Sequence, residues 1–140
     1  MINLIKLCVG VSSVQELEEH RAYRRENGMG RPDGLNVHRT RMMPKRRNEI
    51  IKGGSLYWVM SGLIQCRQKI VDLDSQRDHE GKSCCDILMD PEIVRTIPQP
   101  KRPFQGWRYF RQNDAPSDLK AGAGDGDAEL AAELTKLGLI

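Results

Sequence analysis

The most regular hydrophobic pattern in the chain lies between Gly53 and Asp74, GGSLYWVMSGLIQCRQKIVDLD. Leu56–Met60 is apolar or aromatic at every position, and Leu63–Val71 contains several β-branched residues. Ser61 and Gly62 between them are typical turn residues, so the pattern predicts a β-hairpin. A strand that is apolar on both faces must be covered on both sides, so we expect this hairpin to be the central pair of a sheet.

Two further strands are predicted around this hairpin. Ile2–Val11 is apolar on both faces except at Lys6, whose amine is expected to reach an edge of the sheet, with a catalytic lysine as the alternative. Lys82–Met89 is expected to return to the sheet with Cys85, Ile87 and Met89 facing inward. The polar segment from Asp74 to Gly81 is predicted as the turn that precedes it.

A surface helix is predicted after the first strand. Ser13 and Glu16 have the spacing of a capping box, and the helix is expected to run to about Glu26, with a thin apolar stripe. The glycine-rich segment 27–36 that follows is predicted as a mobile loop.

The next segment combines a strand pattern with basic residues. Val37–Met43 alternates, so a strand would place Arg39 and Arg41 on one face at a spacing of about 7 Å, close to the separation of successive phosphates. Lys45–Lys52 is predicted as a short helix with basic residues in its first turn, where the helix dipole favours acids. A binding surface and a merely solvated run of charges are both compatible with this pattern.

Charge is unevenly distributed along the chain, whose net charge is only +3. The segment from Arg21 to Lys52 holds ten basic and three acidic residues, a local balance of +7, which leaves −4 for the remainder. A basic block of this kind is typical of a protein with a polyanionic partner, although a solvated helix face can look the same.

Aromatic residues gather in Phe104–Phe110, FQGWRYF, which is predicted either as a closing strand whose rings fill the core or as the lining of a pocket. The proline-rich run Pro98–Pro103 before it is predicted as a stiff, polyproline-like connector. We expect one domain over residues 1–112, a flexible linker over 113–127, and an amphipathic helix over 128–140. The leucines of this helix are Leu130, Leu134 and Leu137, and the sequence leaves open whether they pack on the same domain or on a partner.

Composition excludes several classes of protein. Hydrophobic residues make up 39% and charged residues 29% of the chain, a globular balance, and no apolar run approaches the roughly 20 residues of a membrane span. The N-terminus lacks the basic region of a secretory signal, so a cytoplasmic protein is expected. Cys8 and Cys66 are interpreted as buried thiols, and Cys84 and Cys85 show no metal-ligand spacing, so no metal or cofactor is predicted.

Five segments carry a resemblance to a known family: INLIKLCVGV, RMMPKR, GGSLYWV, the run from Gly62 to Leu73, and RPFQGWRYF. On these motifs, which span nearly the whole chain, the sequence is identified as a member of an alphaproteobacterial family, domain of unknown function 1489. The resemblance implies no activity, because none is established for that family.

The order of predicted elements is also similar to that of the PUA-like superfamily, which includes ASCH, EVE and YTH domains. Their glycine turn leads into strands that resemble Ser55–Met60 and Leu63–Leu73. This resemblance implies an α+β fold, a small mixed or antiparallel, partly open β-barrel with two or three flanking helices, that binds RNA or modified bases. It places Tyr57 or Trp58 on a pocket-lining strand and Trp107 or Tyr109 near the pocket mouth. The lysine and acid pair of hydrolytic ASCH members has no match here.

Two functions are consistent with these features. The first is a module that binds nucleic acid, RNA or a modified base, through a basic surface and stacking rings. Its candidate residues are Arg39, Arg41, Lys45, Arg46, Arg47 and Arg67 for phosphates, and Tyr57, Trp58, Trp107 and Tyr109 for stacking or a pocket. The alternative is a protein-interaction or assembly factor whose basic block meets an acidic partner. A small hydrolase using Lys6, Lys69 or a cysteine is a third reading, but no nucleophile, base and orienting group stand together.

Overall fold

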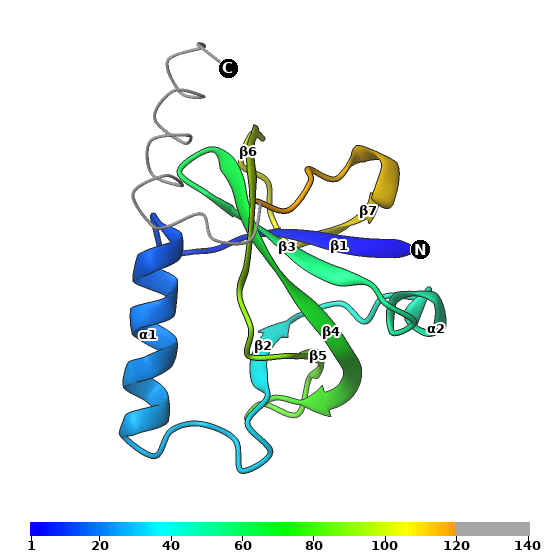
Figure 1. Cartoon of the computed structure of the whole chain (residues 1–140). Coiled ribbons are helices and arrows are strands. Elements are labelled where there is room, and N and C mark those ends of the chain that lie inside the picture. The colour runs from blue at the N-terminus through cyan, green and yellow to red at the C-terminus, as the bar shows by residue number, and fades with distance from the viewer. Residues whose placement is uncertain (120–140) are drawn as a thin grey trace.

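A seven-stranded mixed sheet and two α-helices form residues 1–119, the part of the chain that the computed structural model describes (Figure 1). In chain order the elements are β1 (Ile2–Leu7), α1 (Val14–Glu26), β2 (Asn36–Thr40), α2 (Arg47–Ile50), β3 (Ser55–Met60), β4 (Leu63–Arg77), β5 (Ser83–Met89), β6 (Val94–Pro100) and β7 (Trp107–Arg111). The predicted α+β class is confirmed, and the helix predicted over 128–140 lies outside the described residues. Within residues 1–119, neither helix has the length and apolarity needed to cross a membrane.

The central hairpin predicted from the hydrophobic pattern is confirmed. β3 and β4 pair antiparallel, and Ser61 and Gly62 have φ angles of 50° and 77°, the left-handed conformations of a tight two-residue hairpin turn. β1 lies parallel to β3, and the strands follow the order β2-β5-β4-β3-β1-β7, with β6 paired to β4. Within the described residues the outer strands β2 and β7 do not pair with each other, so the sheet is open and not closed into a barrel.

β4 is longer than its apolar pattern predicts. Its first half pairs with β3 and β6, and its second half, to Arg77, pairs with β5. The register shifts between Ile70 and Asp72, so Val71, where the sequence predicts the strand to end, is a bulge that re-aims the strand. The polar residues 74–77 are strand because β5 supplies their backbone hydrogen bonds, not because their side chains are buried.

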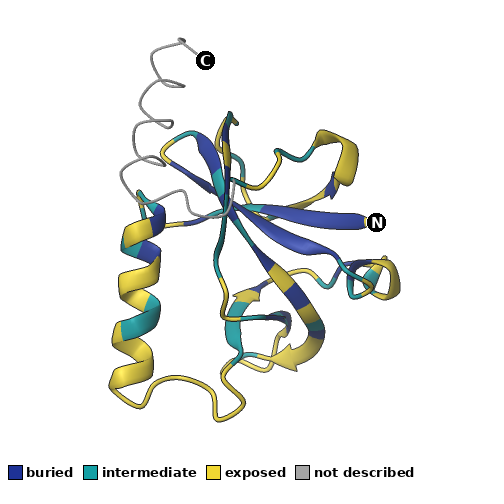
Figure 2. Cartoon of the chain, in the orientation of Figure 1, coloured by how far each residue is buried: buried dark blue, intermediate teal, exposed yellow. Residues whose placement is uncertain are grey.

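Two core clusters lie on the two faces of the sheet, which confirms that β3 is covered on both sides. The larger cluster contains Leu4, Trp58 and Ile70 together with the α1 residues Val14 and Leu17. The smaller one contains Ile5, Tyr57, Val59, Ile64 and Phe110. Figure 2 shows buried residues along β1 and β3, while most of α1 is exposed, as its thin apolar stripe predicts.

The helix start and the third strand also follow the sequence. The Ser13 hydroxyl caps α1 by accepting a hydrogen bond from the Glu16 N–H at 3.1 Å, and Glu16 accepts one from the Ser12 hydroxyl at 2.8 Å. In β5, Cys85, Ile87 and Met89 are fully buried, as the alternation predicts.

Two predicted boundaries are corrected by the pairing of edge strands. β2 ends at Thr40 and not at Met43, because its ladder with β5 ends there, so Arg39 and Arg41 do not lie side by side on one strand. The proline run is likewise not a free connector, since Pro98 and Pro100 belong to β6. Pro98 lies where the ladder between β6 and β4 changes register, so its missing N–H breaks no pair, and Pro100 is the last residue of β6, opposite Leu63.

Candidate functional site

The arginines predicted to bind phosphate each have a carboxylate partner in the structure. Arg39 makes a two-point ion pair with Asp86, with N–O distances of 2.7 and 3.0 Å, and Arg67 makes one with Asp118, at 2.8 and 2.7 Å. The remaining pairs are Arg41–Asp78, Arg46–Glu49 and Arg47–Asp72. The carboxylates cancel most of the positive charge that the sequence assigns to this surface. Lys45 is exposed and makes no ion pair within residues 1–119.

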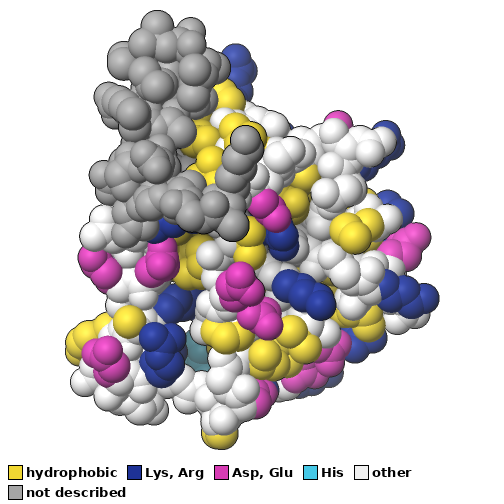
Figure 3. All heavy atoms as spheres, viewed as in Figure 1, with side chains coloured by type: hydrophobic (Ala, Val, Ile, Leu, Met, Phe, Trp, Pro, Cys, Tyr) yellow, Lys and Arg dark blue, Asp and Glu magenta, His cyan; other side chains and the backbone are white. Residues whose placement is uncertain are grey.

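These five arginines also lie on different elements. Arg39 is on β2, Arg46 and Arg47 begin α2, and Arg67 is on β4. Figure 3 shows that basic and acidic side chains alternate over the visible face and do not form one positive patch.

Tyr57 and Trp58 are core residues, only 2% and 1% exposed. Their rings make edge contacts with Phe110 at 5.3 Å and with His38 at 5.1 Å between centroids. This burial agrees with the doubly apolar pattern of the strand, so the stacking role implied by the PUA-like resemblance has no exposed ring face to act on.

Trp107, Tyr109 and Arg46 are the three predicted site residues that the structure brings together. The two rings are in edge contact at 4.9 Å, and the Arg46 guanidinium lies 5.5 Å from the centre of the Tyr109 ring. Trp107 is partly buried and donates its indole N–H to the Met42 carbonyl at 2.7 Å, while the Tyr109 hydroxyl accepts from the Arg46 N–H at 3.2 Å. These contacts tie β7 to the segment before α2, so the rings act as structural residues there.

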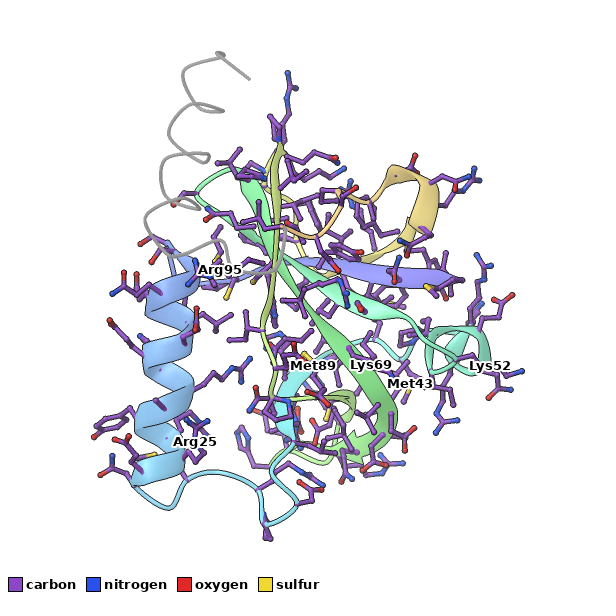
Figure 4. All side chains as sticks on the ribbon, viewed as in Figure 1. Arg25, Met43, Lys52, Lys69, Met89 and Arg95 are labelled. Atoms are coloured by element: carbon purple, nitrogen blue, oxygen red, sulfur yellow. The ribbon has the colours of Figure 1, made fainter. Side chains whose placement is uncertain are left out.

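A different part of the basic block surrounds a cavity of about 260 Å³ between α1, the loop 27–35, the start of β2 and Pro91. We call it the arginine cavity, because Arg21, Arg24, Arg25 and Arg31 line it and none of its lining residues is acidic. Within residues 1–119, no carboxylate oxygen lies within 4.0 Å of a guanidinium nitrogen of Arg21, Arg24 or Arg25, whereas Arg31 pairs with Asp33. Figure 4 labels Arg25 on the part of α1 that faces β2.

The loop that closes this cavity is held by hydrogen bonds to the end of α1 and within itself. The Asn27 side chain donates to the Tyr23 carbonyl at 2.8 Å, and the Met29 N–H donates to the Arg24 carbonyl at 2.8 Å. Further along, the Leu35 N–H donates to the Asp33 carboxylate at 3.0 Å. The loop predicted from its glycines is therefore anchored to the end of α1 and held by an internal hydrogen bond near its other end.

Two residues that line the arginine cavity, Arg21 and Asn36, belong to a hydrogen-bond network centred on Gln68, which is fully buried. Its side-chain oxygen accepts from the Trp58 indole N–H at 3.1 Å and from Arg21 at 3.4 Å. Its side-chain amide donates to the Asn36 side-chain oxygen at 2.8 Å and to the Asp90 carbonyl at 3.0 Å. Every donor and acceptor of the amide is used, so the Gln68 side chain is fixed and in turn positions Arg21 and Asn36.

One N–H donor of Arg21 is not used by this network. Its Nε is buried and has no partner within the described residues, and burial lowers the pKa of its guanidinium. The Asn36 side-chain oxygen is already occupied by Gln68, so the amide that Asn36 can offer to the cavity is a donor. An environment of positive charges and N–H donors is complementary to an anionic oxygen ligand such as phosphate.

The model of a family described as a protein of unknown function, DUF1489, matches residues 4–140. The chain belongs to the DUF1489 family. This confirms the domain-of-unknown-function family that the sequence motifs indicate. Neither the search of curated proteins nor the search of solved structures returned a match.

The cysteines of this DUF1489 member are placed for packing. All four are free and buried, as predicted for Cys8 and Cys66. Burial raises the pKa of the Cys66 thiol and raises that of Cys85 to about 11, so both are protonated at neutral pH and are poor nucleophiles. No cluster of three His, Cys, Asp or Glu side chains within residues 1–119 has the geometry of a metal site.

Lys6 and Arg21 both lie close enough to His38 to affect its protonation. Burial lowers the pKa of Lys6, and burial with the nearby charges of Lys6 and Arg21 lowers that of His38 to about 4, so His38 is neutral at pH 7. Lys6 lies opposite Trp58 on β3 and Trp107 on β7. Within the described residues no carboxylate is in ion-pair distance of Lys6, so it lacks the acidic partner that an acid–base pair requires.

Sequence reasoning counted the cavity arginines of this DUF1489 member in the basic block but did not single them out. Arg21, Arg24 and Arg25 recur at the i, i+3 and i+4 spacing that places side chains on one side of a helix. This spacing, together with the scarcity of acidic residues after Glu19 on the same side of the helix, is the sequence pattern that could have identified these arginines as a group.

Proposed function

We propose that this DUF1489 member binds single-stranded nucleic acid, with RNA as the preferred type, and that its arginine cavity holds the phosphates. The observation that carries the proposal is that four arginines line one cavity without an acidic residue, and that one of them, the half-buried Arg21, has a buried Nε without a partner within the described residues. A cation that is partly removed from water without a counter-ion is unfavourable, so an anion that binds in the cavity offsets that cost.

A polyanion fits this site better than a small isolated anion. Arg21, Arg24 and Arg25 lie along one side of α1, over roughly 6 Å of helix axis, and Arg31 lines the same cavity from the loop, so the positive charge is spread over several side chains and not concentrated at one point. The looser resemblance of the element order to PUA-like domains, whose members bind RNA or modified bases, supports the same class of ligand. In this proposal the arginines paired to carboxylates, such as Arg39 and Arg47, contribute little, because a phosphate would have to displace Asp86 or Asp72 first.

The proposal is tested by fluorescence anisotropy with a labelled single-stranded RNA, using two matched double variants. Arg24→Ala with Arg25→Ala removes two exposed arginines of the cavity, and Arg46→Ala with Arg47→Ala removes two arginines that pair with carboxylates. The first pair is expected to weaken binding at least about tenfold and to reduce the slope of log K against log salt by about 1.4, the equivalent of two phosphate contacts. The second pair is expected to change affinity by less than about threefold.

Circular dichroism and the thermal midpoint of each variant show whether the fold is retained. Equal losses in the two double variants, or a larger loss for Arg46→Ala with Arg47→Ala, contradict the cavity as the phosphate site. No salt-dependent binding by the unmodified protein contradicts the proposed function itself.

A further inference from the structure

Tyr23 is an exposed aromatic ring without a packing partner among the residues that the structure describes. It is 60% exposed, and within residues 1–119, which contain all seven Phe, Trp and Tyr residues of the chain, it makes no ring–ring or cation–π contact. The other six rings each have such a partner: Trp58 contacts His38, Tyr57 contacts Phe110, Trp107 contacts Tyr109, and Phe104 lies against Lys101 and Arg108. An unpartnered ring on an otherwise polar helix is not explained by packing.

The ring lines a second cavity, of about 560 Å³, which adjoins the arginine cavity. Its lining residues are Glu19, His20, Tyr23, Arg24 and Met29. Arg24 and Met29 line both cavities, so these two residues form the boundary between the two spaces. The Met29 N–H donates to the Arg24 carbonyl at 2.8 Å, which fixes the backbone of Met29 at the end of α1.

This arrangement combines an aromatic face, a thioether and a neighbouring group of cations. Aromatic and thioether side chains bind flat, polarizable surfaces, and each nucleobase presents such a face. The arginines next to them are complementary to the phosphate of the same nucleotide. A polyanion without bases, or an acidic protein segment, would use the arginines but leave the ring and the thioether exposed.

We infer that Tyr23 stacks on a base of single-stranded nucleic acid whose phosphate lies in the arginine cavity, with Met29 against the edge of that base. This inference rests on the proposed function and adds the base-binding position to it. Because stacking does not read hydrogen bonds, the position accepts any of the four bases, and Glu19 and His20 at its rim are the groups placed to reach a base edge.

The test compares two labelled ligands of equal length, a single-stranded RNA and the corresponding abasic oligonucleotide, by fluorescence anisotropy. Tyr23→Ala is expected to weaken RNA binding by roughly 5- to 150-fold, the range that corresponds to the contribution of one stacked base, and to leave abasic binding within about twofold. Tyr23→Phe is expected to keep RNA affinity within about threefold, since the ring and not the hydroxyl makes the contact. Tyr109→Ala is the matched control, an exposed tyrosine that already contacts Arg46, and should leave RNA affinity unchanged.

The outcomes separate this inference from the proposed function. RNA affinity unchanged in Tyr23→Ala, together with weakened binding in Arg24→Ala with Arg25→Ala, overturns the base position and leaves phosphate binding in place. Equal weakening of RNA and abasic binding in Tyr23→Ala also overturns it, because a stacked base cannot account for that result. No binding of either ligand by the unmodified protein overturns both.

Discussion

Gln68 shows how a single polar side chain can organise a buried region. Its amide lies in the core, yet each of its hydrogen-bonding groups meets a partner from another element: Trp58, Arg21, Asn36 or the Asp90 carbonyl. A buried amide is favourable only when it is fully paired, and an apolar residue of similar shape would leave several of these partners unpaired. Gln68 therefore links the core around Trp58 to the wall of the arginine cavity.

Gln68→Met is expected to lower the free energy of unfolding by about 2–4 kcal/mol, because the Trp58 N–H and other buried groups lose their partners while the volume stays similar. Urea denaturation followed by tryptophan fluorescence measures the change. Gln65→Met, on the same strand, loses one hydrogen bond to the Met60 carbonyl and should cost only about 1 kcal/mol. Similar losses in the two variants would show that the network around Gln68 adds nothing to its stability.

His38 is expected to make the folded state sensitive to acid. Its pKa is lowered from 6.5 to about 4, so between these values the unfolded chain binds the proton more readily than the folded one. Stability from the neutral imidazole is therefore complete above pH 6.5 and is lost as the pH falls toward 4. Unfolding free energies measured across this interval should decline less steeply in His38→Phe, which keeps a ring against Trp58. Parallel declines would assign the acid sensitivity to the carboxylates instead.

At the scale of secondary-structure elements, the junction of β1, α2 and the start of β3 requires their backbones to approach one another closely. β3 begins at a point where β1 and α2 meet, and a Cβ on Gly54 would lie 2.3 Å from the Ile2 carbonyl oxygen and 2.5 Å from that of Ile50. Both atoms belong to the backbone of packed elements, so they cannot turn aside as the end of a flexible side chain can. Glycine is required at Gly54 for this three-way junction.

Gly54→Ala is accordingly expected to lower the free energy of unfolding by at least about 2 kcal/mol, since β1 or α2 must shift to make room. Thermal or urea denaturation measures the loss. The control is Gly30→Ala in the loop after α1, where the added Cβ would lie 3.7 Å from the nearest atom and no positive φ is involved. Its effect should stay within about 0.5 kcal/mol. A small effect for Gly54→Ala would mean that the junction is looser than these distances indicate.

Across the whole molecule, sequence patterns predict the features whose causes are local. They do not predict the strand ladders and ion pairs that join residues far apart in the chain. The hairpin, the cap at Ser13 and the inward face of β5 were predicted because their causes lie within a few residues. Sequence patterns did not predict the end of β4, the strand through Pro98 or the neutralisation of Arg39, because each depends on a partner far along the chain. Arg39 and its partner Asp86, for example, are 47 positions apart. The sequence predicted a basic block between Arg21 and Lys52. It could not predict which of its arginines lack a carboxylate partner, because that depends on where the acidic residues lie in the folded protein.

β4 also predicts how the molecule unfolds as a whole. It belongs both to the ladder with β3 and β6 and to the ladder with β5, so neither part of the sheet can open without exposing the other. Trp58 and Trp107 report on the β3 and β7 region, and thiol labelling of Cys84 and Cys85, mapped by mass spectrometry, reports on β5. The two probes are expected to give one urea midpoint. Labelling of these cysteines well below the fluorescence midpoint would indicate that β2 and β5 open on their own.

The position of β1 has a consequence for the nascent chain. Its two neighbours in the sheet are β3 and β7, and the latter ends at Arg111. At roughly 5–20 residues per second, a ribosome needs roughly 5–20 s after making β1 to complete β7. Throughout that interval Ile2, Leu4 and Ile5 lack their final cover, so the growing polypeptide exposes an apolar segment to chaperones until β7 has been synthesised.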